Sequence, residues 1–130
     1  MGPDALEARI RDDPYAAWLG IELLDLRPGY CRAAMRLRPH MLNFQGNPHG
    51  GALFSLADYA FGGACNAHGG VAVALSVTIQ FLAAPDPGAR LVAEAREQRQ
   101  GRRAGFYVMT VTDEQGTVVA TCQAVAFRRG

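Results

Sequence analysis

Lysine is missing from this sequence, and charge of neither sign predominates. The 13 basic residues are all arginines, and 12 acidic residues leave a net charge of +1. A nearly neutral chain gives no reason to expect binding to bulk nucleic acid or to an acidic membrane surface. With 130 residues, 49% of them hydrophobic, the chain suits one domain over 1–130 with a single core.

Cysteine is scarce, and the three positions that have it, Cys31, Cys65 and Cys122, are far apart and flanked by small apolar residues. Because no Cys-x-x-Cys pair occurs, neither a zinc site nor a disulfide framework is indicated. The three histidines also lack the spacing of metal ligands. We therefore expect no metal, and cysteines that are buried in the core of a protein from a reducing compartment.

Long uninterrupted apolar segments are absent as well. The first fifteen residues carry six charged side chains where a signal peptide would need an apolar stretch. The apolar region from Met41 to Ala89 is interrupted by Asn, Gly, Pro and Asp, so it is not expected to span a membrane. These absences predict a soluble cytoplasmic protein.

The order of the predicted elements is two strands, one long helix and four strands, after an N-terminal helical segment in 1–19. A charged helix is expected over 4–13, ending near Pro14, and an apolar helix over 49–66, closed by Gly69-Gly70. Strands are expected at 21–26, 30–38, 71–82, 91–100, 106–112 and 118–127. Short connections favour antiparallel pairing. A sheet of about six strands around one central helix is an α+β architecture, and it describes the hot-dog fold.

Asp58 is the residue whose position most needs an explanation. Between Pro39 and Arg90 the only formal charges are Asp58 and Asp86, and Asp86 lies in a Pro-Gly turn. The helix that carries Asp58 is apolar nearly all round, so we expect it to be buried on all sides. Burying a lone carboxylate is costly unless it has a partner. Either Asp58 is functional, or it faces a wet crevice or a loop backbone.

The start of the same helix offers a second candidate group. Gly50 and Gly51 occupy its first turn, where backbone N–H groups have no partners within the helix. Glycine leaves room for a ligand, and the helix dipole favours developing negative charge there. A carbonyl docked at this point would be polarised as in an oxyanion hole.

Helix geometry limits how these two groups can act together. Gly50 and Asp58 are about 12 Å apart along a helix axis, and His49 and Asp58 lie on opposite faces. One helix therefore cannot direct both its start and Asp58 at the same carbonyl. If both serve one reaction, the acid comes from a second, antiparallel helix, which a symmetric homodimer would supply in two composite sites.

Several of these residues together resemble a known family. Leu42-Asn43, Gly46 and the run HGGALFSLAD at 49–58 resemble the signature of the PaaI-type hot-dog thioesterases of phenylacetic acid degradation. The likeness extends from about Gly20 to Phe127, more loosely through 76–82 and 101–103. It implies hydrolysis of an acyl-coenzyme A with a small aryl or medium-chain acyl group, without a cofactor, in a homodimer with shared sites, and a dimer of dimers as a homotetramer.

The resemblance also implies roles for individual residues. Asp58 would be the nucleophile or the general base, and the Gly50 N–H would polarise the thioester carbonyl, with His49 beside it. Asn43 would orient the water or the thioester, and Ser76 would help to hold the water. Asn43 is otherwise a common turn former, and His49 could serve only to shape the loop.

Further residues are expected to contact the substrate. By the same resemblance these are Gly51, Phe54 and Thr78, while Arg102 and Arg103 could meet the phosphates of coenzyme A or could simply be solvated. Phe44, Phe54 and Phe61 offer apolar surface either for an acyl pocket or for the core.

Two other functions fit the same fold. One is a non-catalytic protein that binds or senses acyl-coenzyme A. The other is a hot-dog hydratase or dehydratase that acts on enoyl-coenzyme A. No nucleophile-elbow serine motif of the GxSxG type is present.

Overall fold

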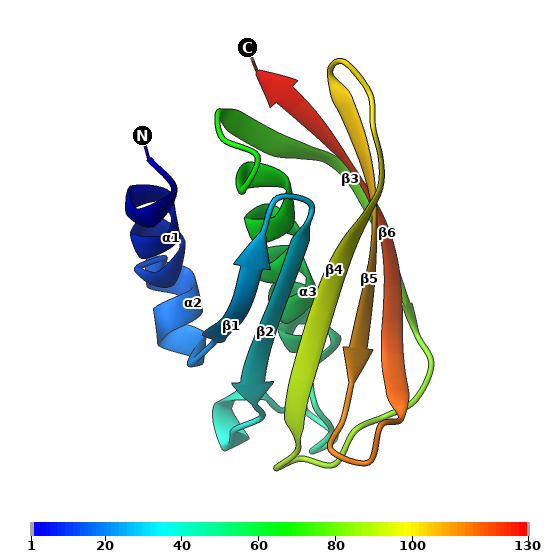
Figure 1. Ribbon diagram of the computed structural model, residues 1–130. Coiled ribbons are helices and arrows are strands. Elements are labelled where there is room, and N and C mark those ends of the chain that lie inside the picture. The colour runs from blue at the N-terminus through cyan, green and yellow to red at the C-terminus, as the bar shows by residue number, and fades with distance from the viewer. Residues whose placement is uncertain (1, 130) are drawn as a thin grey trace.

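The computed structural model describes residues 2–129, and within them six strands form one antiparallel sheet that curves around a long helix (Figure 1). The strands are β1 (Glu22–Arg27), β2 (Tyr30–Arg36), β3 (Val71–Phe81), β4 (Arg90–Gln100), β5 (Ala104–Thr112) and β6 (Val118–Arg129). The helices are α1 (Pro3–Arg11), α2 (Pro14–Leu19) and α3 (Gly50–Asn66), with a short 3-10 helix at Pro39–Met41. This confirms the predicted α+β hot-dog fold.

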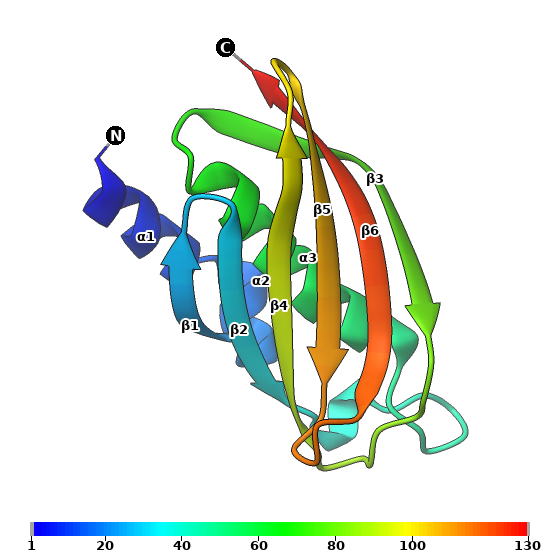
Figure 2. The same cartoon turned by 45° about the vertical axis from the view of Figure 1, so that its right-hand side comes forward.

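Strand order places the strand that follows α3 at the edge of the sheet. The order is β1-β2-β4-β5-β6-β3, so β4, β5 and β6 form consecutive hairpins while β3 pairs only with β6. Figure 2 shows β3 beyond β6, with its outer side unpaired by any described strand. A slip in register between Ala74 and Ser76 interrupts the β3–β6 ladder.

Small side chains line the face of the sheet that meets α3. Successive residues of a strand point to opposite faces, and the inward residues of β4 and β6 are mostly alanines, such as Ala93, Ala95 and Ala126, all buried. Larger inward residues come from β5, where Tyr107 packs edge-on against Phe61 of α3 at 5.4 Å between ring centroids. The alanines let the helix lie close to the sheet, which fixes its position.

Helix α3 has an uncovered stripe, so the expectation that it is buried on all sides is wrong for the single chain. Gly51 and Asp58 are exposed, and Ser55 and Gly62 are partly exposed. Their spacing of four, three and four residues puts them on one face of a helix. The sheet covers the opposite face, and the N-terminal helices cover only part of the remainder.

The N-terminal segment forms two helices, whereas only the first was predicted. The Asp13 side chain accepts a hydrogen bond from the Ala16 N–H at 2.9 Å and caps α2. Pro14 is the first residue of α2, where its fixed φ suits a helix. Pro14 therefore starts a second helix as well as ending the first, and the apolar residues Tyr15, Trp18 and Leu19 belong to that helix.

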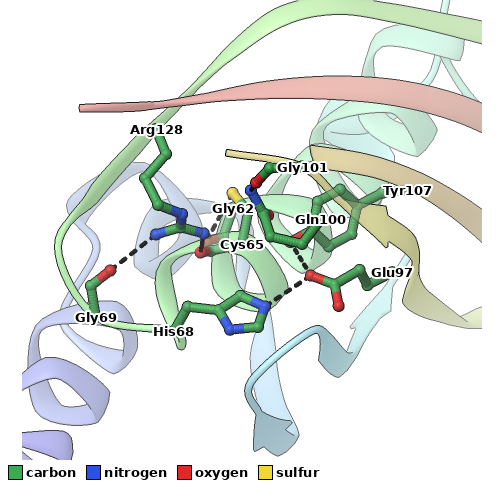
Figure 3. A network of polar contacts seen from close by, with 9 residues as sticks. All are labelled: Gly62, Cys65, His68, Gly69, Glu97, Gln100, Gly101, Tyr107 and Arg128. Atoms are coloured by element: carbon green, nitrogen blue, oxygen red, sulfur yellow. Dashed lines mark hydrogen bonds and ion pairs between the residues drawn. The ribbon is translucent and has the colours of Figure 1, made fainter. Parts of the chain in front are cut away.

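A polar network holds the far end of α3 in place (Figure 3). Arg128 of β6 donates to the Cys65 carbonyl at 2.7 Å and to the Gly69 carbonyl at 2.8 Å. Nε2 of His68 lies 2.7 Å from Oε1 of Glu97 on β4. The same oxygen accepts a hydrogen bond from the Tyr107 hydroxyl at 3.1 Å. Carbonyls at a helix end lack partners within the helix, so Arg128 satisfies groups that would otherwise be unpaired.

We expect Arg128→Ala to lower the free energy of unfolding by roughly 1–3 kcal/mol, because it leaves partly buried carbonyls without a donor. Chemical denaturation of the wild type and the variant measures the difference. Arg129→Ala is the matched control, since Arg129 is exposed. Equal losses for the two variants would contradict a capping role for Arg128.

The predicted character of the cysteines is confirmed. Cys31, Cys65 and Cys122 are buried and unpaired, and burial raises their pKa values to about 12, 11 and 11. Within the described part of the chain, no helix combines the length and apolarity needed to cross a bilayer.

Candidate active site

The loop before α3 is organised around Asn43. Its side-chain oxygen accepts hydrogen bonds from the N–H groups of Gln45 at 2.9 Å and Asn47 at 3.1 Å. Its backbone N–H donates to the Asn47 carbonyl at 2.7 Å, and the His49 N–H donates to Met41. Asn43 is thus a turn former, yet its side-chain amide nitrogen has no acceptor in residues 2–129 and can still donate to a ligand.

The first turn of α3 presents one unused backbone donor. His49 is the N-cap, and its Nδ1 accepts a hydrogen bond from the Gly51 N–H at 3.0 Å. In the neutral ring the proton is therefore on Nε2, which can donate. No acceptor for the Gly50 N–H occurs among residues 2–129, whereas the Gly51 N–H is occupied by the cap. Gly50, and not Gly51, is the donor available to a carbonyl.

Gly50 also lies close to β3. A Cβ at Gly50 would lie 3.0 Å from the Phe81 ring of β3, which is closer than ordinary van der Waals contact. The absence of a side chain at Gly50 thus makes room for Phe81. The sequence suggested that glycine leaves room for a ligand at this position, whereas in the structure the Phe81 ring occupies part of the space where a Cβ would lie.

Asp58 lies two turns beyond Gly50, on the uncovered stripe of α3. Its carboxylate is exposed in the single chain, which corrects the expectation of a buried acid. Its pKa is nevertheless raised, first because the surrounding helices displace part of its hydration and second because the Asp13 carboxylate is nearby. A carboxylate with a raised pKa is a stronger base than an ordinary aspartate.

The remaining predicted site residues are not brought together in one chain. Ser76 and Thr78 are exposed on β3, and Phe54 is partly buried in α3. Arg102 and Arg103 are exposed in the β4–β5 turn, which Figure 1 places at the end of the sheet where α3 finishes, away from where α3 begins. A site that uses all of these residues needs more than one copy of the chain.

Besides the partly buried Phe54, two other phenylalanines were considered for an acyl pocket. Phe61 is buried against Tyr107 and belongs to the core. Phe44 is 95% exposed in the loop before α3. Neither of these lines a cavity beside Asp58 in the single chain.

The edge strand β3 carries an apolar surface that the single chain leaves uncovered. Val71, Leu75 and Phe81 on β3 and Leu82 just after it are 52%, 63%, 53% and 56% exposed. Unpaired backbone groups along an edge strand can extend a sheet into another chain, and exposed apolar patches mark interaction surfaces. The β3 edge is therefore a candidate interface.

Sequence reasoning missed the contacts that α1 and α2 make with α3. The Tyr15 hydroxyl lies 2.9 Å from the Ser55 hydroxyl, and the Tyr59 hydroxyl donates to the Ile10 carbonyl at 2.9 Å. Contacts between residues so distant in sequence leave no local pattern. One sequence feature did point to this region. Glycine is a poor helix former, so Gly62 within α3 indicates that a side chain is disfavoured at this position.

Known proteins with similar sequences and structures bear on this arrangement. Residues 45–120 match the family described as the thioesterase superfamily. The acyl-coenzyme A thioesterase PaaI of Escherichia coli is 37% identical over 123 residues, which are 95% of this chain and 88% of that protein. A putative esterase of Archaeoglobus fulgidus is 34% identical over 91% of this chain and 77% of its own length.

Solved structures agree with these sequence matches. The E. coli PaaI protein from the phenylacetic acid degradation operon superposes with a TM-score of 0.92 and covers 96% of this chain and 91% of its own. A hypothetical thioesterase of Streptococcus pneumoniae, solved with coenzyme A, is 26% identical with a TM-score of 0.87, over 95% of this chain and 96% of its own.

Proposed function

Because this chain belongs to the thioesterase superfamily, we propose that it hydrolyses the thioester of an acyl-coenzyme A to a free acid and coenzyme A. One observation carries the proposal: the same helix presents a solvent-accessible Asp58 with a raised pKa and a Gly50 N–H that has no acceptor in the described residues. The likeness to the PaaI protein of the phenylacetic acid degradation operon supports a small aryl acyl group, and a medium-chain acyl group is the second candidate substrate.

The proposed site is shared between two subunits that pair along β3. Within one chain, Asp58 and Gly50 are about 12 Å apart along the helix axis, too far to act on a single carbonyl. A two-fold axis beside the β3 edge would run the two α3 helices antiparallel and cover the exposed apolar residues of β3. Each site would then combine Asp58 of one subunit with the helix start of the other.

The chemistry needs only water. The Gly50 N–H donates to the thioester oxygen and stabilises the negative charge that develops when the carbonyl is attacked. Asp58 either attacks the carbonyl carbon or removes a proton from the attacking water. The carbon–sulfur bond then breaks, and the sulfur leaves as the thiolate of coenzyme A and is protonated. If water was the attacking group, the free acid is formed in this step. If Asp58 attacked, the acyl-Asp58 anhydride that forms is hydrolysed by a water, which releases the free acid and restores the carboxylate.

Polar residues around the reacting atoms would position the substrate. The free amide nitrogen of Asn43 and Nε2 of His49 can each donate a hydrogen bond to the thioester or the water. Ser76 is exposed on β3 and would hold the water, and Thr78 would contact the substrate. Arg102 and Arg103 offer charge to the phosphates of coenzyme A.

A thiol-release assay over a panel of acyl-coenzyme A esters tests the proposed function. We expect turnover with esters such as phenylacetyl- and hexanoyl-coenzyme A. Binding of these esters without release of thiol would instead indicate a binding or sensing protein. Addition of water to enoyl-coenzyme A, without thioester cleavage, would indicate a hydratase.

The raised pKa of Asp58 predicts where activity falls on the acid side. Catalysis needs the ionised carboxylate, so kcat/KM falls as pH drops through the pKa of Asp58, which is raised from the ordinary value of aspartate. We expect Asp13→Asn to move this acid limb to lower pH, because it removes a nearby negative charge and can still cap α2.

The pH profile of kcat/KM for the wild type and the variant measures this shift. Asp12→Asn is the control, since Asp12 is an exposed neighbouring acid that is not among the causes of the raised pKa. An acid limb that does not move in Asp13→Asn would show that another group controls it.

A further inference from the structure

A cavity of about 550 Å³ lies between α1 and α3, beside Asp58. This volume is within the range of small-molecule sites. Leu6 and Ile10 of α1 and Val71 of β3 give it apolar walls, and Asp13 and Asp58 are among its charged lining residues. The cavity therefore has a place for an apolar group next to the carboxylate that the proposed reaction uses.

Two neighbouring glycines of α3 have different roles at this cavity. A Cβ at Gly63 would lie 2.8 Å from the Cys31 sulfur, so Gly63 is required by packing against β2. A Cβ at Gly62 would meet nothing within 4 Å, and Gly62 lines the cavity. Gly62 is one turn beyond Asp58 on the same stripe of the helix. Because Gly62 has no side chain, there is free space in the cavity, and packing within the protein does not require glycine at this position.

The walls around Gly62 are held by hydrogen bonds. The Tyr59 hydroxyl donates to the Ile10 carbonyl at 2.9 Å and ties α1 to α3. The Asn66 side chain donates to the carbonyls of Gly62 and Ala72 and accepts from the Ala72 N–H. The Asn66 amide is therefore already bonded to the protein. An apolar ligand would contact the walls formed by Leu6, Ile10 and Val71, and the charged residues of the lining are Arg9, Asp13 and Asp58.

We propose that this cavity receives the acyl group of the substrate and that Gly62 sets the size of the acyl group it accepts. The inference rests on the proposed function, because only a thioester held at Asp58 would direct its acyl group here. An aryl or medium-chain group would fill the space beside Gly62, whereas an acetyl group would not reach it. Gly62 is thus a residue that determines specificity.

Substitution of Gly62 tests the proposal. Gly62→Ala and Gly62→Leu place a side chain in open space and improve helix propensity, so the fold should tolerate both. We expect the ratio of kcat/KM for phenylacetyl-coenzyme A to that for acetyl-coenzyme A to fall at least about 10-fold in Gly62→Leu, the scale of steric discrimination in apolar pockets. Gly62→Ala should show a smaller fall.

Two further variants sharpen the test. Ala8→Leu adds the same side chain to an exposed position of α1 that is not among the residues lining the cavity, and it should keep the wild-type ratio. Leu6→Ala enlarges the cavity from the opposite wall and should shift preference toward longer acyl groups. An unchanged ratio in Gly62→Leu, or an equal loss on every ester, would overturn the proposal.

Binding measurements separate this inference from the proposed function. Calorimetry with non-hydrolysable thioether analogues should show that Gly62→Leu loses affinity for the phenylacetyl analogue relative to coenzyme A alone. If the wild type binds that analogue at Gly62 but releases no thiol from any ester, the proposed function fails and the acyl site stands. If Gly62→Leu instead breaks up the dimer on size exclusion, the cavity is filled by the partner subunit and the inference fails.

Discussion

Asp58→Asn is expected to lower kcat/KM for acyl-coenzyme A hydrolysis by at least ~10²-fold, the usual scale for losing a catalytic base or nucleophile. Asparagine keeps the size of the side chain on the exposed stripe of α3 but has no negative charge with which to attack or to accept a proton. The thiol-release assay measures the loss. Asp86→Asn is the matched control, because Asp86 is an exposed acid in the turn before β4 and should retain wild-type activity.

Stability gives the Asp58 prediction a second readout. A carboxyl whose pKa is raised in the folded state stabilises the fold while it is protonated, and that contribution is lost as pH rises through the raised pKa. Above that pH, asparagine avoids the unfavourable charge, so Asp58→Asn should melt at a higher temperature than the wild type. The difference should shrink below the ordinary pKa of aspartate. Nearly wild-type activity in a folded Asp58→Asn variant would refute the catalytic assignment.

Gly50→Pro is expected to lower kcat by about 10²–10³-fold, the effect of deleting one oxyanion-hole donor. Proline removes the backbone N–H and adds a ring, and the first position of a helix tolerates it. His49 already has the extended backbone that proline requires of the preceding residue. Gly50→Ala is the control, since it makes the same first contact with Phe81 but keeps the N–H.

Mixing the two inactive variants tests whether the site is shared. In a heterodimer of Asp58→Asn and Gly50→Pro, one site receives both substitutions and the other receives neither. Random reassortment would make half of the dimers mixed, so about a quarter of wild-type activity should return. Co-expression with two tags isolates the mixed dimer for the assay. A purified mixed dimer with no recovered activity would show that Asp58 and Gly50 do not combine across subunits.

Local patterns in the sequence were sufficient for the six strands and for α1 and α3, and they singled out Asp58 and Gly50 as candidate groups. The alternation along the strands and the apolar run between Gly50 and Asn66 involve residues close in sequence, so they can be recognised without the tertiary structure. Asp58 stood out because it is the only charge in an apolar helix. The glycines at the helix start could be interpreted from the rule that first-turn donors are unpaired.

Only the tertiary structure decided which surfaces stay open and which residues meet. The apolarity of α3 predicted burial on all sides, yet the sheet covers one face and leaves Asp58 exposed. Packing of the N-terminal helices against α3 removes part of the hydration of Asp58 and brings Asp13 near it, and both effects raise the pKa of Asp58. The same packing forms a cavity between α1 and Gly62. The sequence treats Gly62 and Gly63 alike, and packing against Cys31 distinguishes them. The exposure of a side chain and its contacts depend on how segments distant in the sequence pack together, and local periodicity does not encode that packing.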